Sequence, residues 1–163
     1  MNKENSLLRQ RIIPIILFSN YQVVKSRQFD DYRTFGNLEH TISVFNTRNV
    51  DEIIILDIET SKKNKGVNLD VLKIISRNSI MPLTYGGGIT SLNDIELCLK
   101  NGCDKVSINT KCINDISFIS KAAKAFGSQC IVSSVDYKFI NNTYSIYSHS
   151  KNKINNLNII KYI

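Results

Sequence analysis

Three consecutive glycines, Gly86, Gly87 and Gly88, stand between a short apolar run and a helix-like stretch in the segment PLTYGGGIT, residues 82–90. Glycine has no Cβ, so such a turn permits positive φ and lets backbone N–H groups approach another object closely. N–H groups that converge at a strand-to-helix turn can bind an anion such as a phosphate. A tight turn that serves only close packing is the alternative interpretation.

The other residue types that often carry chemistry, above all cysteine and histidine, show no spacing that is typical of a functional site. The cysteines have no C-x-x-C pattern, and neither histidine lies near enough in sequence to suggest a zinc site, so we expect reduced cysteines that act as small hydrophobes, no metal and no cofactor. The net charge of +7 suits a phosphorylated substrate, an acidic partner or nucleic acid, but the lysines are scattered and no aromatic-basic motif is present, which ranks nucleic acid last. The cysteines are Cys98, Cys103, Cys112 and Cys130, and the histidines are His40 and His149.

The composition is typical of a single globular domain over residues 1–163, with 42% hydrophobic and 21% charged residues. The apolar run at residues 12–18 is too short to span a membrane and does not resemble a usual signal region. We therefore expect a cytoplasmic protein with no membrane partner.

Short β-branched runs alternate with amphipathic stretches, which predicts βα units and a parallel sheet. The stretches carry apolar residues at spacings of three and four, with Ser91 as an N-cap and Gly102 as a helix stop. The predicted strands are residues 11–18, 51–58, 80–86, 104–109 and 129–136, and the predicted helices are residues 38–48, 67–77, 92–101 and 116–126. Each strand is nearly continuously apolar, as a strand covered on both faces should be.

Two folds fit these elements. The strand spacing is typical of a (β/α)₈ TIM barrel, but only about five strands are present, and an open parallel sheet would leave its first and fifth strands unpaired. A flavodoxin-like doubly wound sheet is complete with five strands. After the fifth strand, residues 137–150 are polar, alternating and aromatic and predict a hairpin insertion, and residues 155–163 could begin another helix.

Read together, the ordered blocks RIIP, VVK, DEIIILDI, PLTYGGGI, DKVSINT and FGSQCIV…D, spread over residues 11–136, resemble the cyclase subunit of imidazole glycerol phosphate synthase, the HisF-like family of histidine biosynthesis. The resemblance implies a (β/α)₈ barrel of which only a partial barrel, about the first five strands, is present. It also implies an enzyme that closes an imidazole ring on a phosphorylated small molecule with ammonia from a HisH-like glutaminase partner.

The resemblance assigns roles at both ends of the barrel. At the carboxyl ends of the strands, Asp136 matches a general acid/base carboxylate, and substrate or phosphate binding falls to Lys25, Asp57, Gly88, Asn109 and Thr110. At the opposite end, an ammonia gate matches Arg11, Glu52 and Lys105, with Thr84 and Ser107 along the path above it. Without the resemblance, the gate charges would be interpreted as solubility residues that flank strands.

One position departs from the family pattern. The second catalytic carboxylate of the family ends a Pro-Cys-Leu-Asp block, which here reads Pro14-Ile15-Ile16-Leu17. Leucine cannot carry a proton, and general acid/base residues contribute about 10²- to 10⁴-fold in rate, so ordinary cyclase chemistry should be crippled. Because it has an apolar residue at this strand end, the sequence is similar to a paralogous group of proteins that is associated with acetamidino sugars of bacterial surface polysaccharide.

The sequence therefore predicts a HisF-like, ammonia-using synthase that acts on a phosphorylated or nucleotide-linked sugar. An ordinary histidine-pathway cyclase that tolerates Leu17 is one alternative. A non-catalytic partial barrel that binds a glutaminase is another. We expect this chain alone to be inactive and to behave poorly as a monomer.

Overall fold

The computed structural model describes residues 10–27, 31–60, 65–148 and 153–158. Within these residues the main sheet has seven strands in the order β3-β2-β1-β4-β5-β6-β7. The parallel strands are β1 (Ile15–Ser19), β4 (Ile53–Asp57), β5 (Leu83–Gly86), β6 (Lys105–Ile108) and β7 (Ile131–Ser133). They neighbour one another in chain order, which rules out the flavodoxin-like order and is the arrangement of a (β/α)₈ barrel.

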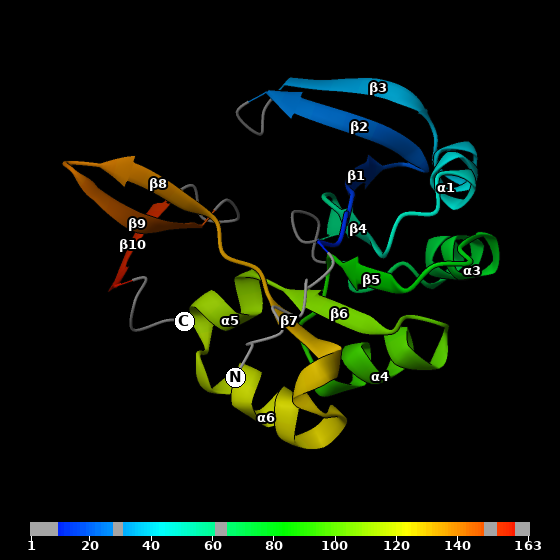
Figure 1. The fold of residues 1–163 in the computed structure, drawn as a ribbon. Helices are drawn as coiled ribbons and strands as arrows, with labels where there is room; N and C mark the ends of the chain where they lie inside the picture. The colour runs from blue at the N-terminus through cyan, green and yellow to red at the C-terminus, as the bar shows by residue number, and fades with distance from the viewer. Residues whose placement is uncertain (1–9, 28–30, 61–64, 149–152, 159–163) are drawn as a thin grey trace, which may run out of the picture.

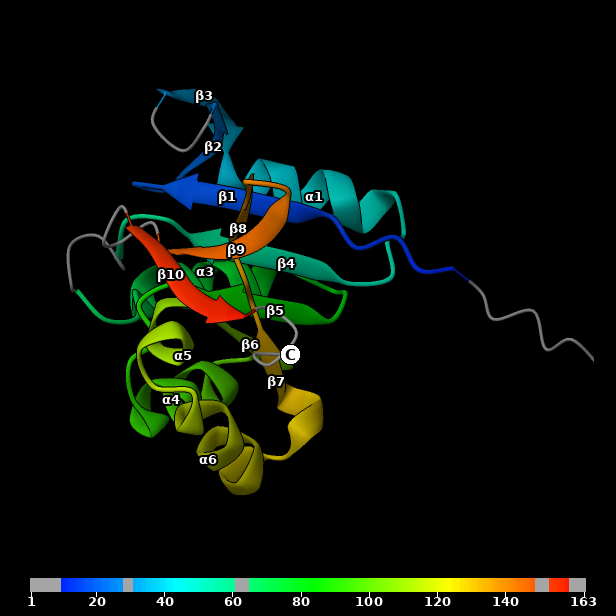
Figure 2. The same ribbon diagram turned by 90° about the vertical axis from the view of Figure 1, so that its left-hand side faces the viewer.

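Helices cover one face of this curved sheet (Figures 1 and 2). All four predicted helices are present, as α1 (Leu38–Thr47), α3 (Leu69–Asn78), α4 (Leu92–Lys100) and α6 (Ser117–Phe126). The predicted N-cap Ser91 forms a capping box with Asp94, and Gly102 follows α4 with a φ of 97°. Two short elements were not predicted, α5 (Thr110–Asn114) and the 3₁₀ turn η1 (Ser128–Cys130), because neither is long enough to show a helical period.

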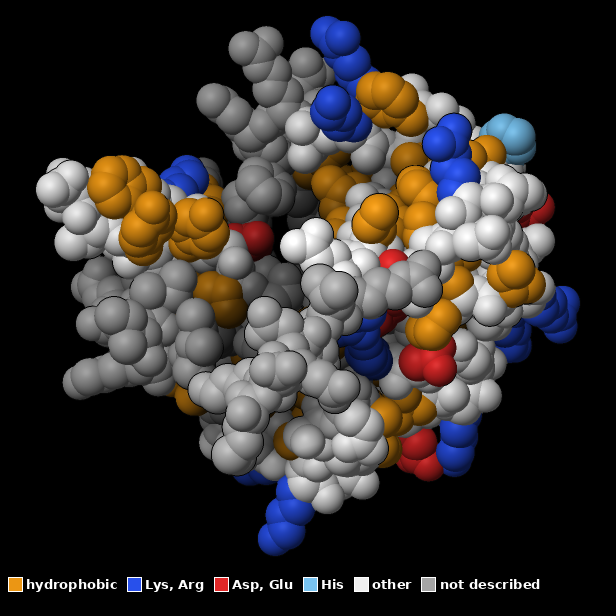
Figure 3. All heavy atoms as spheres, in the orientation of Figure 1, with side chains coloured by type: hydrophobic (Ala, Val, Ile, Leu, Met, Phe, Trp, Pro, Cys, Tyr) orange, Lys and Arg blue, Asp and Glu red, His pale blue; other side chains and the backbone are white. Residues whose placement is uncertain are grey.

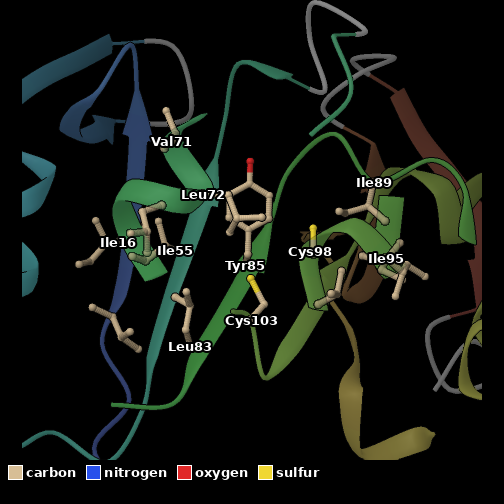
Figure 4. Packing of buried hydrophobic residues seen from close by; sticks show 14 of the residues in the cluster. Ile16, Ile55, Val71, Leu72, Leu83, Tyr85, Ile89, Ile95, Cys98 and Cys103 are labelled. Carbon is tan, nitrogen blue, oxygen red and sulfur yellow. The ribbon is translucent and has the colours of Figure 1, made fainter. Parts of the chain in front are cut away.

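The core lies between the sheet and the helices (Figure 4). Strand β4 alternates, with Ile53 and Ile55 fully buried against the helices and Ile54 and Leu56 only partly buried on the other face. The expectation that both faces are covered is therefore wrong for β4, whereas all four residues of β5 are buried. At about 1.5 to 3 kcal/mol for each fully buried aliphatic side chain, the helix-side face contributes most of the hydrophobic stabilisation.

The cysteines pack as small hydrophobes. Cys98, Cys103 and Cys112 are buried, Cys130 is partly buried, and none of the four is in a disulfide in the described structure. Figure 4 shows Cys98 and Cys103 beside the ring of Tyr85. A hydrogen bond with Cys98, together with burial, raises the pKa of the Cys103 thiol, so Cys103 is an unreactive part of the core.

A β-hairpin that the sequence analysis missed follows β1. Strands β2 (Gln22–Arg27) and β3 (Asp31–Asn37) run antiparallel, and β2 pairs with β1 (Figure 1). Asn20 and Tyr21, which connect β1 to β2, have φ of 48° and 63°, as in the two-residue turns that favour hairpins. The expected unpaired edge of the first strand is thus wrong, because β2 occupies it.

A second sheet of three antiparallel strands follows β7, in the order β10-β9-β8 (Figure 1). Its strands are β8 (Tyr137–Ile140), β9 (Thr143–Ser148) and β10 (Lys153–Asn158). The helix expected from residue 155 is wrong for residues 155–158, which belong to β10, and residues 159–163 lie outside the described residues. Figure 3 shows hydrophobic side chains gathered at this edge of the molecule, where Tyr137, Phe139 and Tyr144 are exposed.

None of the helices in the described parts of the chain has both the length and the apolar character needed to cross a membrane.

Candidate functional site

The strand register defines a continuous face opposite the helices, which we call the inner face. Residues paired across parallel strands share a face, so Leu17, Leu56, Gly86 and Ser107 form one row across four strands. Thr84 and Lys105 pair in the next row toward the strand N-termini. The inner face therefore connects a floor at the N-terminal ends of the strands with a rim at their carboxyl ends.

The floor holds a cluster of charged and polar side chains centred on Glu52. The Lys105 ammonium donates to both Glu52 oxygens, at 2.9 and 2.7 Å, and the Thr84 hydroxyl donates to Oε1 at 2.8 Å. Arg11 contributes a looser ion pair of 3.8 Å, and its side chain is 64% exposed. The structure thus brings together four of the five predicted gate and path residues, which we call the floor cluster: Arg11, Glu52, Thr84 and Lys105.

Glu52 stays charged within this cluster although its residue is only 4% exposed. Burial opposes ionisation, but the hydrogen bonds from Lys105 and Thr84 and the charges of Lys105 and Arg11 outweigh it and lower the Glu52 pKa. These bonds offset the cost of burying the carboxylate, and removal of one partner would leave its charge less well compensated. Ser107, the fifth predicted residue, is buried one row above.

At the rim, the predicted catalytic residue contacts a predicted phosphate ligand. The Asn109 amide donates to Asp136 Oδ2 at 2.8 Å, across the carboxyl ends of β6 and β7. Asp136 also connects to the second sheet, since its carbonyl accepts from Tyr147 N at 2.9 Å. Thr110 begins the short helix α5 beside them. Asn109 therefore positions Asp136, a role that the sequence analysis did not assign.

The glycine triplet has a packing explanation that needs no ligand. A Cβ on Gly87 would lie 2.3 Å from the Asp57 carbonyl oxygen, and one on Gly88 would lie 2.4 Å from the Gly66 carbonyl oxygen. Their φ values, 117° and 71°, also exclude most side chains. Close approach of the chain that follows β4 accounts for both residues, so their presence does not by itself indicate a phosphate site.

Asp57 ends β4 beneath this turn rather than on the inner face. Its Oδ1 accepts from the backbone N–H groups of Glu59 and Thr60, at 2.9 and 3.2 Å. Burial raises the Asp57 pKa, partly offset by these hydrogen bonds, and the nearby charge of Glu59 raises it further. Its geometry is that of a carboxylate that fixes a turn.

Lys25 is also kept apart from the inner face. Val24 pairs with Leu17 and shares its face, so the neighbouring Lys25 lies on the opposite face of β2, where it is exposed. Its partner across the hairpin is Arg33. In the described conformation, the structure does not bring Lys25 to Asn109 and Asp136.

The structure adds one carboxylate that the sequence analysis missed. The Glu59 carboxylate accepts hydrogen bonds from the Ser19 hydroxyl and from the Asn20 amide, the latter at 3.1 Å. These residues are about forty positions apart in sequence. No local spacing could have indicated the contact, because it depends on the pairing of β1 with β4.

Sequential parallel strands, helices on one face and polar groups at both ends of the other define an α/β protein built from successive βα units. Comparison with known families agrees with this class. The profile of the family described as "Histidine biosynthesis protein" matches residues 11–163. The chain belongs to this family, whose fold is a (β/α)₈ barrel.

Curated relatives carry the names of one subunit. The chain is 48% identical over 141 residues to the "Putative imidazole glycerol phosphate synthase subunit hisF2" of Campylobacter jejuni, which covers 86% of this chain and 56% of the relative. It is 40% identical over 157 residues to the protein of that same name from Vibrio vulnificus, and this match covers 96% of the chain and 58% of the relative. It is 40% identical over 143 residues to the "Imidazole glycerol phosphate synthase subunit HisF" of an Exiguobacterium species, and this match covers 88% of the chain and 56% of the relative. The chain thus spans a little over half the length of these relatives.

Proposed function

We propose that this chain is the N-terminal part of a HisF-like barrel that acts as an ammonia-using synthase. Its substrate is a phosphorylated or nucleotide-linked sugar, and its product is an acetamidino sugar for surface polysaccharide such as lipopolysaccharide. Ammonia comes from a HisH-like glutaminase partner, and the reaction takes place in the cytoplasm. The family membership supports the cyclase-like scaffold, while the substrate class is our own inference.

The observation that carries the proposal is the environment of Leu17. This residue pairs with Leu56 on one side and with Val24 on the other, so the end of β1 presents an apolar patch on the inner face. Ring closure by the ordinary cyclase divides proton transfers between two carboxylates, and the Leu17 side chain cannot accept a proton at the strand position where the family has the first of them. A reaction with a different substrate fits the retained scaffold better.

The floor cluster supports the use of ammonia. The negative charge of Glu52 lies between the positive charges of Lys105 and Arg11, so the cluster repels a cation such as ammonium, whereas a small neutral molecule such as ammonia is not repelled. Arg11 is the most exposed member and faces the end where a partner that supplies ammonia would dock. Thr84 within the cluster and Ser107 one row above it provide hydroxyl groups along the inner face.

Genetic complementation tests the proposal. The complete gene that encodes this chain should fail to restore growth without histidine in a strain that lacks the histidine cyclase, while a HisF gene expressed from the same vector restores it. The Leu17→Asp variant of the complete gene places a carboxylate at the position where the family has one, and it is the matched control. Growth supported by the unaltered gene would favour the ordinary cyclase and contradict the proposed substrate.

A scaffold that only binds and activates a glutaminase is a second candidate, favoured by one observation. The glycine turn is explained by packing, and the Asn109 amide is already bonded to Asp136, so two predicted phosphate ligands have other roles. Titration of the complete protein with inorganic phosphate separates the two functions. Saturable binding that Thr110→Ala weakens supports the synthase, whereas lack of binding supports the scaffold.

A further inference from the structure

We propose that Glu59 supplies the acid/base carboxylate on the β1 side of the mouth, in place of the family carboxylate that Leu17 replaces. This inference rests on the proposed synthase function. Asp136 stands at the end of β7, and the second proton-transfer group has to come from the other side of the inner face. Among the described residues, Glu59 is the carboxylate that the fold holds against the end of β1.

The backbone of Glu59 is fixed from within its own turn. Asp57 Oδ1 accepts from Glu59 N at 2.9 Å and from Thr60 N at 3.2 Å, which closes the turn directly after β4. Glu59 therefore leaves the sheet at a defined point. A side chain held on a fixed backbone meets the positional demand of a catalytic group.

The side chain is directed toward the inner face by β1. Ser19 and Leu17 are two residues apart on one strand, so they share a face, and their Cα atoms lie about 7 Å apart. The Ser19 hydroxyl and the Asn20 amide both donate to Glu59 Oε1. The Glu59 carboxylate is thus drawn to the face that carries Leu17, one side-chain position nearer the rim.

The chemistry at this position is proton transfer. The nitrogen of ammonia bonds to the acetamido carbon, and two N–H protons move to the carbonyl oxygen. That oxygen departs as water, and a C=NH group remains. Glu59 carries one of these protons from the attacking nitrogen to the departing oxygen and Asp136 carries the other, so both carboxylates are regenerated. Ser19 acts as a positioning residue, because it touches Glu59 and not the reacting atoms.

A purely structural role for Glu59 is the competing interpretation, since its hydrogen bonds tie the β1–β2 turn to β4. Glu59→Gln separates the two roles. The glutamine side-chain oxygen can still accept from Ser19 and Asn20, so the tie is kept, but an amide cannot exchange a proton in this way. Leu17→Asp adds a second test, because an aspartate there could transfer protons but could not hold the turn.

The experiment uses the organism that carries the gene, with the complete gene deleted and reintroduced as variants. The readout is the ratio of acetamidino to acetamido sugar in purified surface polysaccharide, measured by mass spectrometry, with the amount of folded protein measured alongside. We expect Glu59→Gln to lower product formation by about tenfold or more, as for loss of an acid/base group, at an unchanged protein level. Glu96→Gln, on the exposed face of α4, is the matched control and should behave like the unaltered gene.

The outcomes are distinct. Partial rescue of Glu59→Gln by Leu17→Asp in the same chain would support proton transfer at this side of the mouth. Normal product formation by Glu59→Gln would overturn the inference and leave the proposed function intact. Loss of product in proportion to loss of folded protein would also overturn it, in favour of the structural tie. A deletion that leaves the polysaccharide unchanged would remove the proposed function, and the inference with it.

Discussion

The Asn109 amide donates a hydrogen bond of 2.8 Å to the Asp136 carboxylate, and this contact joins the carboxyl ends of β6 and β7. Both residues had been assigned separate tasks, phosphate binding and catalysis. Their contact makes them one unit, because rotation of either side chain would release the other.

Replacement of Asn109 by aspartate should make stability depend on pH. Two carboxylates at hydrogen-bonding distance cannot both ionise cheaply, so one keeps a proton or the pair separates. The variant should lose about 1 to 3 kcal/mol of unfolding free energy at pH 7, and the loss should shrink as pH falls below 4. Denaturant unfolding at several pH values measures this. Asn109→Ala, which adds no charge, should show a loss that does not depend on pH, and equal pH profiles for the two variants would contradict the prediction.

Acid should weaken the protein through Glu52. Its pKa is lowered in the folded state, so its contribution to stability is complete above the ordinary glutamate value of about 4.3 and is lost as pH falls through the lower folded value. Glu52→Gln should therefore reduce the unfolding free energy near neutral pH and flatten its decline in acid. The measurement is unfolding free energy against pH from 7 to 3. A decline as steep in Glu52→Gln as in the unaltered protein would show that other groups carry the acid sensitivity.

Asp57 should behave in the opposite way. Burial raises its pKa, so the folded state holds the proton more tightly, and the stability contributed by protonation is lost as pH rises through the folded value. Asp57→Asn keeps an oxygen that can accept from Glu59 N and Thr60 N and removes the buried charge. We expect equal or higher stability at pH 7 by thermal unfolding, with a smaller gain at pH 4. A clear loss of stability at pH 7 would mean that the charge itself holds the turn.

Two glycines with nearly the same φ separate backbone strain from crowding. Gly88 and Gly66 have φ of 71° and 69°, but a Cβ on Gly88 would meet Gly66 O at 2.4 Å, whereas a Cβ on Gly66 would meet no described atom within 4 Å. Gly66→Ala should cost about 1 to 2 kcal/mol from the left-handed conformation. Gly88→Ala should cost about 1 to 3 kcal/mol more from overpacking. Denaturant unfolding measures both, and equal losses would refute the packing explanation of the glycine turn.

Much of the fold could be predicted from local pattern. The helices were found because apolar residues three and four apart face the sheet, and Ser91 marked a helix start because its hydroxyl satisfies the free Asp94 N–H. The antiparallel pairing of β2 with β1 escaped prediction because the turn between them, Asn20-Tyr21, lacks the glycine that usually signals such turns. Residues 155–158 were wrongly assigned because a short polar segment takes its structure from the strand beside it.

For the site, sequence by itself determined which chemical groups exist: a carboxylate at Asp136, a leucine at position 17, three adjacent glycines, and charges that begin successive strands. It also determined the βα alternation, since residue spacing alone sets helical and extended periodicity. Only tertiary structure decided which groups meet. Strand register placed Glu52 between Lys105 and Thr84, turned Lys25 away from Leu17, and brought Glu59 to Ser19. The physical reason is that pairing between strands joins residues dozens of positions apart, and such contacts leave no periodic trace along the chain.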